Sequence, residues 1–254
     1  MAAKKMMPRP HTLIRGISRF SGNLALMLGK RCSICSAVIE KLRPGITLCA
    51  QCAGELKARR GGFCGMCARI YALEDESTHL CFDCRNYPFS WHGISFYSIY
   101  QGLLKAIILR YKYGGDLGLG RALGSLLQEA ASLHPHENLD LIVPVPLHAG
   151  RLRRRGFNQS LELSRILGKG INLPVKPDLL IKTKHTPPQS SMKRKLRLKS
   201  LQNAFEVRHS QLNDKMILLV DDIMTTGSTL EQCTRTLLRA GASEVRVVFL
   251  ARAV

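Results

Sequence analysis

The chain has 254 residues, of which 45% are hydrophobic, and a formal net charge of +20 at pH 7. This length and apolar content suffice for one medium-sized domain and a smaller second one. No run approaches the ~20 consecutive apolar residues that cross a bilayer, so we expect no transmembrane segment and a cytoplasmic protein. The charge indicates an anionic partner, nucleic acid before an acidic membrane surface; a basic surface kept for solubility is the alternative.

Residues 1–31 form a basic extension, and no acidic side chain precedes Glu40. Basic clusters without interleaved acids are not typical of a salt-bridged helix surface. We expect an amphipathic arm that contacts DNA, a partner or a membrane surface, with a mitochondrial transit peptide as the alternative. The basic side chains are Lys4, Lys5, Arg9, Arg15, Arg19, Lys30 and Arg31.

Eight of the nine cysteines form two identical C-x2-C-x13-C-x2-C units. Each C-x2-C places two thiolates on one side of a tight turn, and two such turns complete a tetrahedral zinc site. The spacing predicts a double zinc-ribbon module over residues 32–90, with the ribbons in series or, alternatively, cross-braced. The first quartet is Cys32, Cys35, Cys49 and Cys52, and the second quartet is Cys64, Cys67, Cys81 and Cys84.

Other uses of these cysteines fit the sequence less well. A disulfide framework is unusual in a chain without a secretion signal. His79 could replace a ligand of the second quartet, but a solvated loop histidine fits as well, and Cys233 has the helical spacing of a core residue. Because a site closed by four cysteines leaves no position for substrate, we expect structural zinc that folds a recognition or scaffolding module.

Strands and helices alternate over residues 91–254, which predicts an α/β domain with a mostly parallel, doubly wound sheet. Apolar and β-branched runs predict the strands, and apolar spacing with glycine stops predicts the helices. The predicted strands are 94–100, 140–147, 216–220 and 244–251. The predicted helices are 103–113, 117–133 and 228–240, and residues 151–167 are predicted to begin with a basic turn and to continue as a helix.

An arginine cluster follows the second of these strands. Val143-Pro-Val-Pro146 carries the chain off the strand, and Gly156-Phe-Asn-Gln-Ser160 opens a helix. Arginines beside a helix N-terminus suit a pyrophosphate, so we take Arg151 and Arg155 as candidate ligands. An ordinary basic surface loop is the alternative reading of this segment, which also holds Arg153 and Arg154.

The segment 186–205 is long, polar and basic, with Lys193, Arg194, Lys195 and Arg197 in it. A long connection of this kind inside a compact domain is usually functional or disordered. It could close over an anionic ligand as a flap that excludes water. It could equally contact the backbone of a nucleic acid, since few aromatic residues accompany the charge.

The most specific motif lies at residues 216–229, where five apolar residues run into Asp221 and Asp222 and then into a hydroxyl-rich turn. Ligands of open α/β sheets bind at the carboxyl ends of such strands. The turn can direct N–H groups and hydroxyls at one phosphate, and the acidic pair can accept the hydroxyls of a ribose. The sequence therefore predicts a site for a ribose 5-phosphate. We call the turn the phosphate loop; it comprises Thr225, Thr226, Gly227, Ser228 and Thr229.

This motif resembles the phosphoribosyl pyrophosphate (PRPP) site of type I phosphoribosyltransferases. The resemblance implies that Asp221 and Asp222 hold the ribose hydroxyls of PRPP, which binds together with Mg²⁺, and that the phosphate loop holds the 5-phosphate. A strand that ends in an aspartate cap beside a structural turn is the alternative, but a cap accounts for one aspartate and not two.

From Cys32 onward the chain resembles the ComF family of competence proteins. The resemblance implies a zinc-binding module on a phosphoribosyltransferase-like domain, and a role in handling incoming single-stranded DNA during natural transformation. A DNA-uptake helicase and other competence proteins are the implied partners. The motifs that carry the resemblance are the paired cysteines, Tyr111-Lys-Tyr113, Val143-Pro-Val-Pro146, Arg155-Gly-Phe-Asn-Gln-Ser160, Asn203-Ala-Phe205 and the Asp221-Asp222 loop.

Two classes of function remain open from the sequence. In the first, a binding protein keeps the PRPP site for sensing or anchoring, while the ribbons and basic clusters bind DNA or a partner. In the second, an active phosphoribosyltransferase transfers the ribosyl group to an unidentified acceptor in nucleotide metabolism, mainly by positioning and charge stabilisation. No segment reads as a nucleobase-binding hood, and the fold alone does not establish transfer.

Overall fold

The computed structural model describes residues 30–39, 48–72, 78–135, 137–184, 203–208 and 212–253. The predictions for the basic arm and for most of the flap therefore lie outside the described residues. The chain divides into two compact units, residues 1–49 and 50–254. In the first unit, strand β1 (Lys30–Arg31) pairs antiparallel with β2 (Val38–Ile39).

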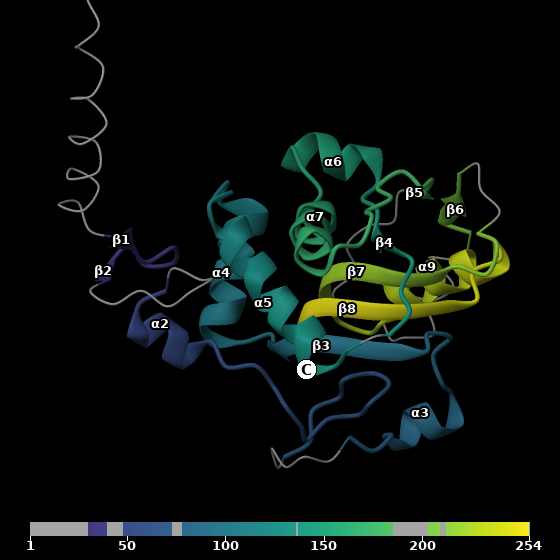
Figure 1. Cartoon of the computed structure of the whole chain (residues 1–254), viewed down its shortest axis with the longest axis horizontal. Coiled ribbons are helices and arrows are strands. Elements are labelled where there is room, and N and C mark those ends of the chain that lie inside the picture. The colour runs from purple at the N-terminus through teal and green to yellow at the C-terminus, as the bar shows by residue number, and fades with distance from the viewer. Residues whose placement is uncertain are drawn as a thin grey trace, which may run out of the picture. The chain divides into compact units, whose positions relative to one another are not determined.

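A four-stranded, fully parallel sheet forms the centre of the second unit (Figure 1). Its strands, in spatial order, are β3 (Gly93–Ile99), β8 (Glu244–Arg252), β7 (Met216–Met224) and β4 (Leu141–Pro144). The central strands are covered on both faces, which explains their nearly continuous apolar sequences. The predicted parallel α/β architecture is confirmed.

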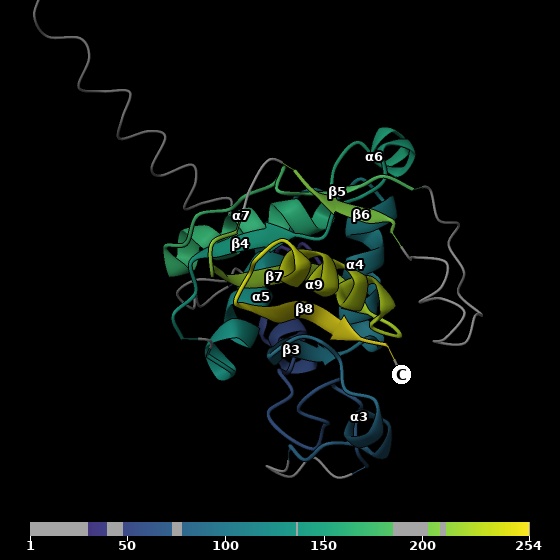
Figure 2. The ribbon, with the colours of Figure 1, turned by 90° about the vertical axis from the view of Figure 1, so that its right-hand side faces the viewer.

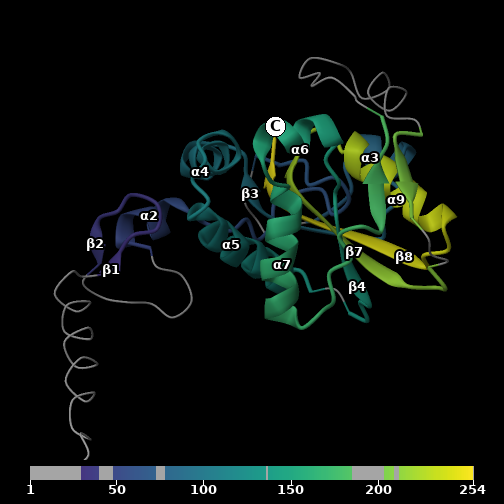
Figure 3. The same cartoon turned by 90° about the horizontal axis from the view of Figure 1, so that it is seen from above.

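Helices cover both faces of this sheet, as the view along its layers shows (Figure 3). Helices α5 (Leu119–Leu133) and α7 (Gln159–Ile171) pack on one face, and α9 (Ser228–Arg239) packs on the other. Helix α4 (Gly102–Tyr113) packs against α5. The contact between α5 and α7 is close, because a Cβ at Gly124 would lie 2.5 Å from Ile166 Cγ2.

The second quartet belongs to the same hydrophobic core as the sheet. Its four cysteines are buried together with Phe89 and Trp91, and this cluster continues to Leu219 of β7 and Cys233 of α9. Helix α2 (Ala50–Glu55) precedes this region and α3 (Phe82–Asn86) lies within it. Figure 2 shows α3 beyond the β3 edge of the sheet.

Four elements differ from the predictions. The arginine cluster is not a turn but a separate helix, α6 (Ala149–Arg155), which ends at Gly156 with φ 85°. Strand β7 continues four residues beyond its predicted end and so includes both aspartates. The strands β5 (Leu180–Lys182) and β6 (Phe205–Val207) were not predicted, and they pair antiparallel with each other.

Candidate functional site: an acidic pair beside a phosphate loop

The two carboxylates of the site lie at the carboxyl end of β7 and have different partners. Asp221 Oδ1 accepts hydrogen bonds from Ser160 Oγ at 3.0 Å and from the Asp222 amide at 2.9 Å. Asp222 Oδ2 pairs with Lys112 Nζ at 2.6 Å, with side chains only 12% and 13% exposed. Two helices therefore hold the pair, α7 through Ser160 and α4 through Lys112.

The segment between α6 and α7 explains how Ser160 reaches the acidic pair. Gly156 ends α6 in the left-handed region, where a residue without a Cβ is favoured. Asn158 then caps α7, since its Oδ1 accepts from the Ser160 amide at 3.1 Å while its Nδ2 donates to Val145 O at 3.1 Å. This side chain therefore ties the start of α7 to the chain just after β4 and fixes the Ser160 hydroxyl.

Burial raises the pKa of Asp221 to about 7, and the negative charge of Asp222 adds to this shift. The charge of Lys112, the Asp222 amide and the Ser160 hydroxyl act in the opposite direction. Because this carboxyl group is poorly hydrated, any additional hydrogen-bond donor that reaches it stabilises it. The hydroxyl groups of a sugar are donors of this kind.

The phosphate loop connects β7 to the N-terminus of α9. Gly227 has φ 78° and precedes the first helical residue, Ser228. Within the loop, Thr226 Oγ1 lies 2.9 Å from Ser228 Oγ and accepts weakly from the Ser228 amide at 3.4 Å. The loop and the end of β7 line a small hollow that includes Asp221, Thr225 and Thr229. The positive end of the α9 dipole faces this region, which suits an anion.

Lys182 of β5 interacts electrostatically with Asp221 and with Arg151 of α6. Burial lowers the pKa of Lys182, and the nearby charge of Arg151 lowers it further, while Asp221 opposes the shift. Arg155 donates to Gln159 Oε1 and lies over the ring of Tyr113, 4.9 Å from its centroid. Lys182 therefore lies within electrostatic reach of both Asp221 and Arg151, and Arg155 is engaged with its own neighbours.

Both cysteine quartets are assembled as two separate clusters in series, with the sulfur atoms of each within 4.8 Å of one another. Cys35 Sγ lies 3.7 Å from Cys49 Sγ, and Cys67 Sγ lies 3.8 Å from Cys81 Sγ. Zinc with four thiolates at about 2.3 Å requires sulfur separations of about 3.8 Å, so both clusters fit structural zinc. All nine cysteines are free of disulfides.

The two quartets share the same local turn. In the first, Cys32 O accepts from the Ser36 amide at 2.9 Å; in the second, Cys64 O accepts from the Ala68 amide at 2.9 Å. Ser36 and Ala68 both have positive φ, 62° and 51°. The repeated spacing therefore corresponds to a repeated conformation. His79 is not part of the second quartet; it stacks on Tyr71 at 4.3 Å.

Comparison with known proteins identifies the family. The phosphoribosyl transferase domain family matches residues 152–253. Competence protein F of Haemophilus influenzae is 31% identical over 229 residues, which cover 88% of this chain and 97% of that protein. The chain belongs to the ComF family. Other relatives are the DNA utilization protein YhgH of Escherichia coli K12 (30% identity, 81% of this chain and 96% of that protein) and competence protein ComFC of Bacillus subtilis (30%, 79% and 81%).

The structure adds three residues to the site of this ComF protein that the sequence did not single out as ligands. Lys112 and Ser160 appeared in the family motifs, but no role was assigned to them. Nothing in the sequence pointed to Lys182, because the β5–β6 pair was not predicted. Lys112 follows a buried tyrosine near the end of α4, so only the packing of α4 brings it to Asp222.

Among the described residues no helix is long and apolar enough to cross a membrane.

Proposed function

We propose that this ComF protein binds Mg²⁺-PRPP at the carboxyl end of β7 and assists the handling of single-stranded DNA. The observation that carries the proposal is the acidic pair beside the phosphate loop. Asp221 and Asp222 would accept the two ribose hydroxyls, and Thr225 to Thr229 would surround the 5-phosphate. Arg151 and Lys182 supply positive charge for the pyrophosphate, whose charge Mg²⁺ would help to neutralise. The metal accompanies the ligand and requires no site of its own.

Calorimetric titration of Mg²⁺-PRPP into the zinc-loaded protein tests this assignment. We expect the Asp221→Asn/Asp222→Asn variant to lose at least tenfold in affinity, about 1.4 kcal/mol, because amides are weaker acceptors for hydroxyls than carboxylates. Asp140→Asn is the matched control, since Asp140 contacts Lys215 and the Met216 amide at the other end of β7. Unchanged affinity of the double variant would refute the site.

The proposed DNA contact is electrostatic and includes α6. Arg153 and Arg154 of this helix are exposed, and the names of the relatives associate the family with competence and DNA utilization. Binding of a labelled oligonucleotide should weaken with salt, with a slope that falls by about 0.7 for each lost phosphate contact. We expect Arg153→Gln/Arg154→Gln to lower this slope and the charge-matched Lys169→Gln/Lys176→Gln to leave it unchanged; a salt-independent affinity would contradict the electrostatic account.

A transfer reaction is the second candidate, favoured by Lys182, which interacts electrostatically with both Asp221 and Arg151. A nucleophile would form a bond to the anomeric carbon as the bond to pyrophosphate breaks, and the leaving group would keep the electron pair. Arg151 and Lys182 would stabilise the charge that develops on it. Release of pyrophosphate from PRPP on addition of a candidate acceptor, such as a nucleobase or an oligonucleotide, measures this reaction. A binding protein would show saturation with PRPP and no release.

A further inference from the structure

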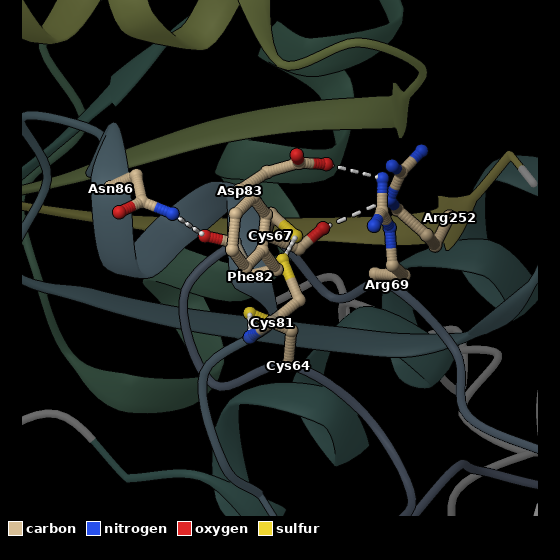
Figure 4. A network of polar contacts seen from close by, with 8 residues as sticks. All are labelled: Cys64, Cys67, Arg69, Cys81, Phe82, Asp83, Asn86 and Arg252. Atoms are coloured by element: carbon tan, nitrogen blue, oxygen red, sulfur yellow. Dashed lines mark hydrogen bonds and ion pairs between the residues drawn. The ribbon is translucent and has the colours of Figure 1, made fainter.

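One guanidinium group joins the second quartet to the phosphate loop. Arg252, the last residue of β8, donates through Nε to Cys67 O at 2.9 Å (Figure 4). Its Nη1 donates to the backbone carbonyls of Met224, at 3.3 Å, and of Thr225. A ligand cysteine of the zinc cluster and the start of the phosphate loop thus share one rigid, planar partner.

These contacts determine where the loop directs its amides. The carbonyls of Met224 and Thr225 belong to the peptide groups that also contain the amides of Thr225 and Thr226. In a planar trans peptide the N–H points opposite to the carbonyl. Because Arg252 attracts both carbonyls, it turns these two N–H groups away from the cysteine cluster.

A second connection runs through Phe89, in the segment that follows the second quartet. A Cβ at Gly227 would lie 2.9 Å from Phe89 Cε1, so the loop packs directly on this ring. Phe89 stacks on Trp91 with 4.0 Å between ring centroids. The Phe89 amide donates to Met66 Sδ at 3.3 Å, and Trp91 Nε1 donates to Met66 O at 2.8 Å. Met66 lies between two cysteines of the second quartet.

A third connection reaches the first turn of α9. The amide and hydroxyl of Ser90 donate to the Glu231 carboxylate at 2.9 and 2.8 Å, and Glu231 is only 2% exposed. The Glu231 amide in turn donates to Gly227 O at 2.9 Å. The segment after the second quartet is therefore attached to the helix end that faces the proposed phosphate.

We propose that Arg252 is a positioning residue through which the zinc-loaded second quartet holds the phosphate loop ready for its ligand. Zinc in the second quartet and a phosphate group at the loop then strengthen each other's binding. This inference rests on the proposed function, because it takes the loop as the site of the PRPP 5-phosphate. Coupling between two sites is reciprocal, so PRPP must retain zinc to the same extent that zinc favours PRPP.

The first test compares Arg252→Met with Arg246→Met in the zinc-loaded protein. Both substitutions remove an arginine from β8, but Arg246 pairs with Glu244 at the opposite end of the strand. We expect about a tenfold loss of PRPP affinity by calorimetry for Arg252→Met, within the usual range of site coupling, and less than a twofold loss for Arg246→Met. Equal affinities of the two variants would overturn the role of Arg252.

The second test needs no variant. Zinc release from the wild-type protein to a chromogenic chelator is followed with and without Mg²⁺-PRPP. We expect PRPP to slow the release of one of two zinc ions severalfold. If wild-type protein binds PRPP but releases both zinc ions at unchanged rates, the coupling is wrong and the proposed function stands. If the wild-type protein does not bind PRPP, the proposed function fails and this inference fails with it.

Discussion

Lys112 and Asp222 form a buried ion pair that joins α4 to the end of β7, with 2.6 Å between Nζ and Oδ2. The pair gives Asp222 a cationic partner, whereas burial of the neighbouring Asp221 raises its pKa. Helix α4 is therefore part of the site, although its sequence gives only an ordinary amphipathic pattern.

Loss of the lysine should destabilise the fold strongly. We expect Lys112→Met to lower the free energy of unfolding by about 3 kcal/mol, because it leaves a buried carboxylate without a partner. Chemical denaturation of the zinc-loaded protein measures this. Arg165→Met is the control, since Arg165 pairs with Glu162 at the surface, with side chains 58% and 38% exposed, and should cost less than about 1 kcal/mol. Equal losses would show that the Lys112 pair is not effectively buried.

The raised pKa of Asp221 predicts a pH dependence of stability. In the unfolded chain this carboxyl ionises near 3.8, whereas in the fold its pKa is about 7. Between these values the folded state binds the additional proton, so the contribution of Asp221 to stability falls as pH rises from about 4 to 7. Asp221→Asn should flatten the profile in this window and be more stable than wild type at pH 8. Parallel profiles for the two proteins would contradict the shift.

Zinc content tests the two clusters. We expect two zinc ions per chain by elemental analysis, and one in Cys64→Ser/Cys67→Ser. This double variant should also be clearly less stable than the wild type, since a structural zinc site contributes directly to folding and the second quartet lies in the main core. Cys233→Ser is the control and should retain both ions, because Cys233 belongs to neither quartet. Two zinc ions in the Cys64→Ser/Cys67→Ser variant would remove the second quartet as a site.

Gly227 offers a test of the phosphate loop that separates backbone strain from steric clash. Gly227 and Gly102 both have positive φ, 78° and 51°, but a Cβ at Gly102 meets nothing within 4 Å. Alanine at either position should incur a backbone cost of about 1 kcal/mol. Gly227→Ala should lower the free energy of unfolding by about 1–3 kcal/mol more than Gly102→Ala. The added Cβ would press on Phe89 and Met224, and chemical denaturation measures the difference. Indistinguishable losses would mean that the loop can move away from Phe89.

The features that were predicted correctly depend on residues close together in the sequence, and the features that were missed depend on residues far apart in it. The cysteine pairing followed from local spacing, and the repeated turn at Ser36 and Ala68 reflects the same local chemistry. The end of β7 was placed too early, because its carboxylates depend on partners such as Ser160, 61 residues away. No periodicity in one segment reveals such a partner.

Helix α6 illustrates a second kind of error. Consecutive arginines suggested a turn, yet arginine is a good helix former, and charge alone does not interrupt a helix. The interruption comes at Gly156, and the new start comes from the Asn158 cap. The strands β5 and β6 were missed because each has only three residues and finds its partner across a long connection.

The different partners of Asp221 and Asp222 also separate the evolutionary constraints on the two carboxylates. Substitutions in α4 reach Asp222 through Lys112, whereas substitutions in α7 reach Asp221 through Ser160. Relatives could therefore change one half of the acidic pair while the other half keeps its surroundings. Covariation within this family should accordingly divide into two groups of positions, one around Lys112 in α4 and one around Ser160 in α7.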